Sequence, residues 1–125
     1  MPDPHLQKHP KLRAKPFKDP AKVPPAIQLA LRQAMMTEKV PTDQYDDLLW
    51  ILAQESEGNI GIHNGQGSTA RGLFQLLKAQ YHFYPKGEAS FGNAVEECQG
   101  GIRYIVARFH NAAAARKFWE RHHWY

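Results

Sequence analysis

Prolines are concentrated at one end of this chain: seven of its nine lie within residues 1–25. Proline lacks a backbone N–H and fixes φ, so this stretch is a poor helix and a poor interior strand. Beyond it only Pro41 and Pro85 interrupt the chain. Because 125 residues are too few for two ordinary domains, we expect an extended N-terminal arm over residues 1–25 and one folded domain over residues 26–125.

The same division appears in the charge. The arm carries six basic residues against two acidic ones, 6 minus 2 or +4, which equals the formal net charge of the whole chain. Residues 26–125 are therefore neutral, and we expect no specific recognition of nucleic acid. The basic arm is either a solvated linker or a segment that docks on a partner or an anionic surface.

Two classes of protein are excluded at once. A lone cysteine, Cys98, is incompatible with an internal disulfide scaffold. No segment approaches the roughly 20 apolar residues needed to span a bilayer, and even residues 26–36 contain Gln28, Arg32 and Gln33. The interrupted run also lacks the pattern of an ordinary secretory signal. We expect no transmembrane segment and no conventional export.

Helical spacing dominates the rest of the sequence, and we expect a mainly α fold. The apolar residues predict helices beginning at Pro24-Pro25, at Thr42 as N-cap and ending near Ser56, over residues 70–81, over residues 93–110, and over residues 112–122 after Asn111 as N-cap. Residues 58–68 hold four glycines and two asparagines, which favour turns or a short hairpin flap. Gly100 and Gly101 each cost about 1 kcal/mol in a helix, so close packing or substrate approach should require them.

One carboxyl group stands out. Glu55 follows Leu48, Ile51 and Leu52 at helical spacing, which places it on the apolar side of its helix, in the last turn. Burial and the negative end of the helix both raise the pKa of a carboxyl, so Glu55 could hold a proton and donate it. The alternative is a structural salt bridge with, for example, Arg71 or Arg103.

Other reactive side chains point less clearly to a site. The seven histidines lack the spacing of metal ligands, and Cys98 falls on an apolar stripe, as a small core residue does. We therefore expect no metal and no cofactor. Large aromatics, such as Trp119 and Trp124, either stack on sugars or close the core.

Three sequence blocks resemble, in order, those of the lytic transglycosylase domain of the lysozyme-like superfamily. The blocks are Ile51-Leu52-Ala53-Gln54-Glu55-Ser56, Gly67-Ser68-Thr69-Ala70-Arg71-Gly72-Leu73-Phe74-Gln75 and Gly101-Ile102-Arg103-Tyr104-Ile105. The resemblance covers about residues 43–125. The last eight residues, 118–125, are similar to the close of such domains in bacteriophage tail and virion proteins.

The resemblance implies a lysozyme-like α lobe with a short flap. Glu55 matches the family's catalytic acid and base, while Gln75 and Tyr104 match residues that line the glycan cleft. We expect Phe74 in or under that cleft. The flap differs from the family's common form in length and lacks its usual Ser-Pro, so Ser68 and Asn64 are alternative matches for the cleft serine.

The acidic residues bear on the mechanism. Retaining and inverting glycosidases use a second carboxylate roughly 5 to 9.5 Å from the first, yet no Asp or Glu lies between Gly58 and Gly87. Glu88, Glu96 and Glu97 remain possible second acids, because the sequence does not determine their distance from Glu55. A lone acid favours intramolecular attack. The resemblance implies cleavage of the β-1,4 bond between N-acetylmuramic acid and N-acetylglucosamine, with closure of a 1,6-anhydro ring.

Two alternatives stay open: a muramidase that uses water, and a virion or wall-binding protein that keeps the fold without turnover. Since peptidoglycan lies outside the cytoplasm, the resemblance and the missing export signal together favour delivery by a phage particle that opens the host wall during genome entry. We expect the protein in the virion, acting in the host periplasm or wall, with the arm contacting other virion or tail proteins.

Overall fold

The computed structural model describes residues 17–63 and 67–125, and over these residues the chain is mainly α-helical. The α-helices are α1 (Pro25–Thr37), α2 (Tyr45–Ser56), α3 (Ala94–Phe109) and α4 (Ala112–His122). Short 3-10 helices are η3 (Pro20–Lys22), η4 (Thr42–Gln44), η5 (Lys78–Phe83) and η6 (Gly87–Ser90). The predicted mainly α class is confirmed.

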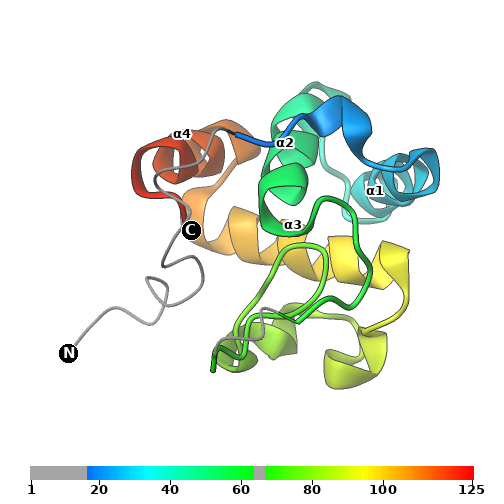
Figure 1. Ribbon diagram of the computed structural model, residues 1–125. Helices are drawn as coiled ribbons and strands as arrows, with labels where there is room; N and C mark the ends of the chain where they lie inside the picture. Colours follow the sequence, from blue (N-terminus) through cyan, green and yellow to red (C-terminus); the bar gives the residue numbers. More distant parts are fainter. Residues whose placement is uncertain (1–16, 64–66) are drawn as a thin grey trace.

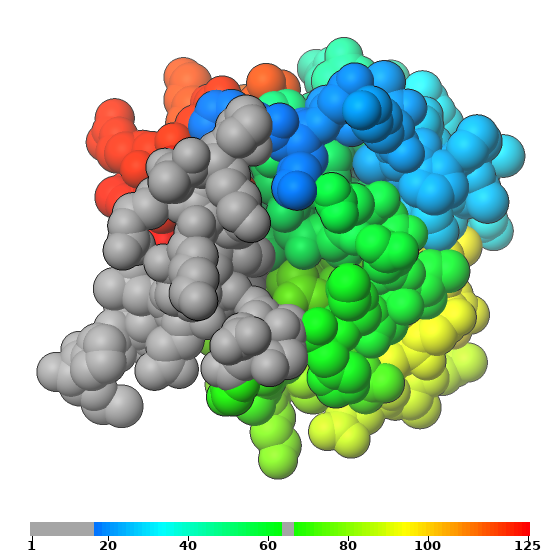
Figure 2. Space-filling model, in the orientation of Figure 1, coloured from blue at the N-terminus to red at the C-terminus, as the bar shows by residue number. Residues whose placement is uncertain are grey.

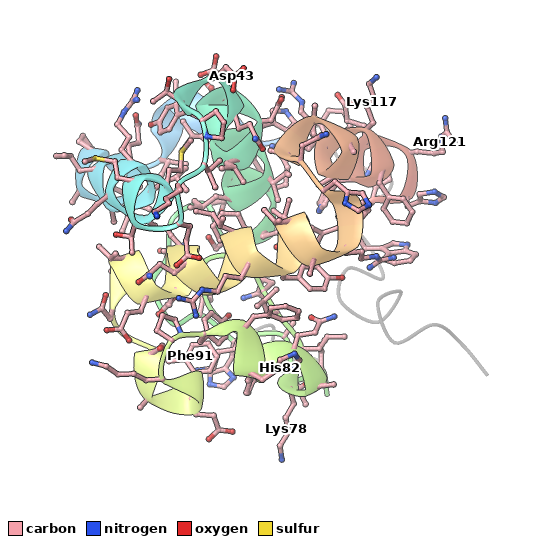
Figure 3. All side chains as sticks on the ribbon, turned by 180° about the vertical axis from the view of Figure 1, so that it is seen from behind. Asp43, Lys78, His82, Phe91, Lys117 and Arg121 are labelled. Carbon is pink, nitrogen blue, oxygen red and sulfur yellow. The ribbon has the colours of Figure 1, made fainter. Side chains whose placement is uncertain are left out.

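Helix α3 runs through the middle of the molecule (Figure 1). Helices α1, α2 and α4 lie on one side of it, and the loops that carry η5 and η6 lie on the other, as the reverse view also shows (Figure 3). Helix α1 packs along α3, and α2 packs against α4. The end of α2 therefore faces α4 and the middle of the molecule.

Local signals account for most helix starts. Pro25 occupies the first turn of α1, where its missing N–H is tolerated. The side chains of Asn93 and Asn111 accept the N–H groups of Glu96 and Ala114, at 3.0 and 2.8 Å, and so cap α3 and α4; the cap at Asn111 was predicted.

The predicted cap of α2 is wrong. Thr42 lies in η4, and α2 begins after Gln44, whose side chain makes no cap hydrogen bond. Instead Oε1 of Gln44 accepts the N–H of Ala112 at 2.9 Å. A contact between the starts of α2 and α4 takes the place of a local cap.

The predicted helix over residues 70–81 is also wrong. Residues 70–77 form turns with antiparallel bridges from Arg71 to His63 and to Leu76, and only η5 follows. Gly72 and Gln75 adopt left-handed backbone angles, with φ of 88° and 53°. The N–H of Gly72 donates to the carbonyl of Ile62, so the loop's backbone is bonded to its neighbours rather than to a helical turn. Tertiary hydrogen bonds override the apolar spacing.

Close packing explains the glycine pair of α3. A Cβ on Gly100 would lie 2.1 Å from Cδ1 of Tyr84, and one on Gly101 would lie 2.2 Å from Cγ of Phe74. Both aromatic rings rest directly on the helix backbone. Among the described residues, no helix has the length and apolar character needed to cross a membrane.

Candidate active site

Glu55 lies in the last turn of α2 and is 7% exposed. The chain turns away directly after it, because Glu57 and Gly58 both have left-handed backbone angles. A Cβ on Gly58 would lie 2.8 Å from Cδ of Pro24, so this turn fits against the start of α1 only with glycine. Leu48, Ile51 and Leu52 are buried on the same helix, as predicted.

The carboxyl group of Glu55 is held from α4. Nε1 of Trp119 donates to Oε2 of Glu55 at 2.8 Å, and the indole is 2% exposed. An indole N–H can only donate, so the oxygen of Glu55 is the acceptor in this contact. The acid is thus buried and keeps a directed hydrogen bond to the indole.

The salt-bridge alternative for Glu55 is not realised with either predicted arginine. Arg103 forms a bidentate pair with Glu38, at 3.0 Å from Nε to Oε1 and 2.9 Å from Nη2 to Oε2. The guanidinium of Arg71 lies 4.2 Å from the ring centroid of Phe91.

Two buried phenols belong to the same site. Burial raises the pKa of Tyr104, Arg108 lowers it, and the charge of Glu55 raises it. Burial, and next the charge of Glu55, raise the pKa of Tyr125 well above its ordinary value. Glu55 therefore acts electrostatically on both hydroxyl groups. The rings of Tyr104 and Tyr125 meet edge to face, with centroids 5.3 Å apart.

Each phenol is oriented by a hydrogen bond. Nη1 of Arg108 donates to the hydroxyl oxygen of Tyr104 at 2.6 Å. The hydroxyl of Tyr125 donates to the backbone carbonyl of Phe74. The guanidinium of Arg108 is itself bracketed by the rings of Phe109, Phe118 and Trp124, at 4.9, 5.1 and 5.3 Å from their centroids.

A second buried carboxylate organises the loops beside the site. Oε1 of Glu97 accepts the N–H groups of Gly61 and Leu73, at 3.1 and 2.9 Å, and Oε2 accepts that of Gly92 at 2.7 Å. A Cβ on Gly72 would lie 3.0 Å from Oε1, at a φ of 88°. This carboxylate therefore fixes three chain segments, and its oxygens are occupied by backbone donors.

The predicted cleft residues divide into two groups. Tyr104 belongs to the surroundings of Glu55. Phe74 joins them indirectly, because its carbonyl accepts the hydroxyl of Tyr125, on which Glu55 also acts. Gln75 is buried, and its Nε2 donates to the carbonyls of Ile62 and Gly72 at 2.9 Å each, so its amide closes the loop.

Of the two candidates for the cleft serine, the structure describes one. Oγ of Ser68 accepts the N–H of Ala70 at 3.0 Å, a contact within its own turn. Asn64 lies outside the described residues.

Three aromatic residues make contacts at this site that the sequence did not predict. Trp119 had two open interpretations, sugar stacking or core closure, and its hydrogen bond to Glu55 is a third role. Tyr125 is fully buried although it is the last residue of the sequence. Phe17 falls within the predicted arm but packs against Trp119, with ring centroids 6.2 Å apart. Only the clustering of aromatics near the end of the sequence hinted at these contacts.

Two further observations bear on chemistry. No three His, Cys, Asp or Glu side chains of the described chain gather as metal ligands would. Cys98 is buried, and burial raises the pKa of its thiol, as in a core residue. A groove of about 350 Å³, lined in part by Lys18, Ala53 and Glu57, opens beside the end of α2. Ala53 is two residues before Glu55 on α2, about 200° around the helix, and Glu57 lies beyond the end of the helix, so this groove is not the pocket of the buried acid.

Comparisons with models of protein families, with curated proteins and with solved structures returned no match. The function must therefore be inferred from the chemistry of the site and from the sequence blocks described above.

Proposed function

We propose that this chain is a peptidoglycan lytic transglycosylase in which Glu55 serves as both acid and base. The observation that carries the proposal is the buried carboxyl of Glu55, held at a helix end by the indole N–H of Trp119. The sequence blocks that resemble lytic transglycosylases supply the substrate class. The bond cleaved is the β-1,4 linkage between N-acetylmuramic acid and N-acetylglucosamine.

In the first step Glu55 gives its proton to the glycosidic oxygen. The bond between that oxygen and C1 of the muramic sugar breaks, and its electron pair stays on the oxygen, so the glucosamine side leaves as an alcohol. The neighbouring N-acetyl group stabilises the positive charge that develops at C1, in place of a protein carboxylate. The burial of Glu55 supports this step, since removal from water disfavours the charged form of a carboxyl.

In the second step the Glu55 carboxylate takes the proton of the muramic 6-hydroxyl. Oxygen 6 then bonds to C1 and closes the 1,6-anhydro ring, and Glu55 is protonated again. Neither water nor a cofactor is consumed. The N–H of Trp119 stabilises the carboxylate that exists between the two steps, because a donor to the charged form favours it.

The distribution of acids supports a one-carboxyl mechanism. Among the described residues, the other buried carboxylate is Glu97, and its oxygens accept three backbone N–H groups. It lies seven residues before Tyr104 on α3, about 10 Å along the helix axis. Glu57 faces Lys18, with Oε1 and Nζ 3.2 Å apart.

The biological setting is also a proposal. The C-terminal block resembles the close of phage tail and virion proteins, and the first 25 residues carry the chain's net positive charge. We place the protein in a virion, from which it acts on peptidoglycan strands in the host periplasm or wall. The basic N-terminal region would contact other virion proteins.

Digestion of purified sacculi tests the reaction. The full chain is incubated with the sacculi, and the released muropeptides are weighed by mass spectrometry. A transglycosylase releases ends that are one water lighter than the hydrolytic product. Release of ordinary reducing ends would instead identify a water-using muramidase, and tight binding to sacculi without release would identify a wall-binding protein.

A further inference from the structure

The residues just before η3 lie across the end of α2. The side-chain amide of Gln54 bonds both backbone groups of Lys18: Oε1 accepts the N–H at 2.8 Å and Nε2 donates to the carbonyl at 2.9 Å. Nζ of Lys18 also pairs with Oε1 of Glu57 at 3.2 Å. We refer to Phe17–Asp19 as the N-terminal strap. Figure 2 shows the first described residues, in dark blue, against α2 in green and beside the red C-terminal part.

The strap places an aromatic ring over the support of the acid. The ring of Phe17 meets Trp50 and Trp119 edge to face, with centroids 5.2 and 6.2 Å apart. It stacks on His123 at 5.8 Å and 24°. Phe17 remains 49% exposed, so this ring closes the outer side of the cluster.

Trp119 is enclosed by the other members of this cluster. Trp50 approaches it edge to face at 5.5 Å, and His123 at 5.4 Å. Phe17 supplies the third flank. An indole confined on three sides has few rotamers available, and its Nε1 is directed at Oε2 of Glu55.

We propose that Phe17 is a positioning residue for Glu55, acting through Trp119, and that the N-terminal strap belongs to the catalytic unit. The inference rests on the proposed function. Removal of the Phe17 ring frees one flank of Trp119, and the N–H that orients the carboxyl is then held less firmly. A misplacement of an ångström at a reacting group can cost about a hundredfold in rate, so a partial loss of order is expected to cost about tenfold.

The test uses the full chain with Phe17→Ala, Phe17→Leu and the surface control Lys117→Ala. Lys117 projects from the outer face of α4 (Figure 3). We expect kcat on sacculi to fall about tenfold in F17A with KM unchanged, and to stay near the parent value in F17L and K117A. If the ring instead stacked on sugar, its removal in F17A would raise KM and leave kcat unchanged. That result would overturn the proposal.

A second readout does not depend on activity. The chain has three tryptophans, and the indole N–H resonance of Trp119 is assigned from its loss in Trp119→Phe. We expect that resonance to move, and to exchange faster with solvent, in F17A, while that of Trp124 stays in place. An unchanged Trp119 signal in a folded F17A chain would overturn the proposal. This NMR test remains valid even if the parent chain releases no muropeptides, because that result refutes only the proposed function.

Gln54→Leu provides an independent test in case F17A does not fold. It removes both bonds to Lys18 without touching the aromatic cluster. We expect the same change in the Trp119 resonance and the same fall in kcat. Since both substitutions release one strap, their combined effect should fall well short of the product of the single effects. Independent, multiplicative effects would contradict a shared role.

Discussion

Trp119 and Glu55 stand 64 positions apart in the sequence, and the indole N–H of the first lies 2.8 Å from a carboxyl oxygen of the second. This hydrogen bond joins α4 to the end of α2. It gives a buried acid a directional partner on the neighbouring helix. In the proposed reaction the same carboxyl acts first as acid and then as base, and this hydrogen bond holds it in place for both stages.

Trp119→Phe removes this donor and keeps an aromatic ring. We expect the free energy of unfolding to fall by about 0.5–1.5 kcal/mol, the usual net contribution of a hydrogen bond between neutral groups, since the resting acid carries its proton in the proposed reaction. Turnover of sacculi should fall more steeply than stability accounts for, because the carboxyl loses its orientation. Chemical denaturation and initial rates measure the two effects. Unchanged rates in a folded W119F chain would show that the indole is only a packing residue.

Glu97→Gln tests the role of the second buried carboxylate. The NH2 group that replaces one oxygen cannot accept a hydrogen bond from the backbone N–H that it faces. At least one of the three donors therefore loses its partner. We expect a loss of about 1–3 kcal/mol in stability. Hydrogen exchange at Gly61, Leu73 and Gly92 should accelerate more than exchange within α1. Uniform acceleration across the chain would contradict a local anchoring role.

The pair of Glu38 and Arg103 makes stability depend on pH. Hydrogen bonding from Arg103 holds the pKa of Glu38 below its ordinary value of 4.5, although burial opposes this. A carboxyl whose pKa is lowered by folding stabilises the fold above its unfolded pKa, and this contribution is lost as pH falls through the folded pKa. We therefore expect the free energy of unfolding to fall below about pH 4.5.

Glu38→Gln isolates that contribution. Urea unfolding is measured for the parent and E38Q at several pH values from about 7 down to 3. E38Q should be less stable at neutral pH, and its stability should vary less between about pH 4.5 and 3. Parallel pH profiles of the two chains would assign the acid sensitivity to other groups.

Local signals made the helices predictable. Pro25, Asn93 and Asn111 mark helix starts through effects confined to a turn or two, and the structure has them in those roles. The glycine pair of α3 likewise indicated close contact, which Tyr84 and Phe74 supply. Glu55 could be placed on a buried helix face because its three apolar neighbours share the same helix.

Long-range contacts decide the rest. The segment from Ala70 to Leu77 has apolar spacing typical of a helix, but the N–H of Leu73 donates to Glu97 and that of Gly72 to the carbonyl of Ile62. The partners of Glu55 come from α4 and from the end of the chain, and no local pattern reports such pairings. Phe17 was assigned to an arm by its proline-rich surroundings, whereas Gln54 holds its neighbour Lys18 on the domain.

The most direct test of the central claim compares the parent chain with Glu55→Gln on purified sacculi. The amide keeps the size of the side chain but neither donates a proton as an acid nor accepts one as a base. We predict that E55Q folds with parental circular dichroism and releases no anhydro-muropeptides, while Glu120→Gln, an exposed control on α4, retains activity. Release of anhydro products by E55Q at the parental rate would contradict the account.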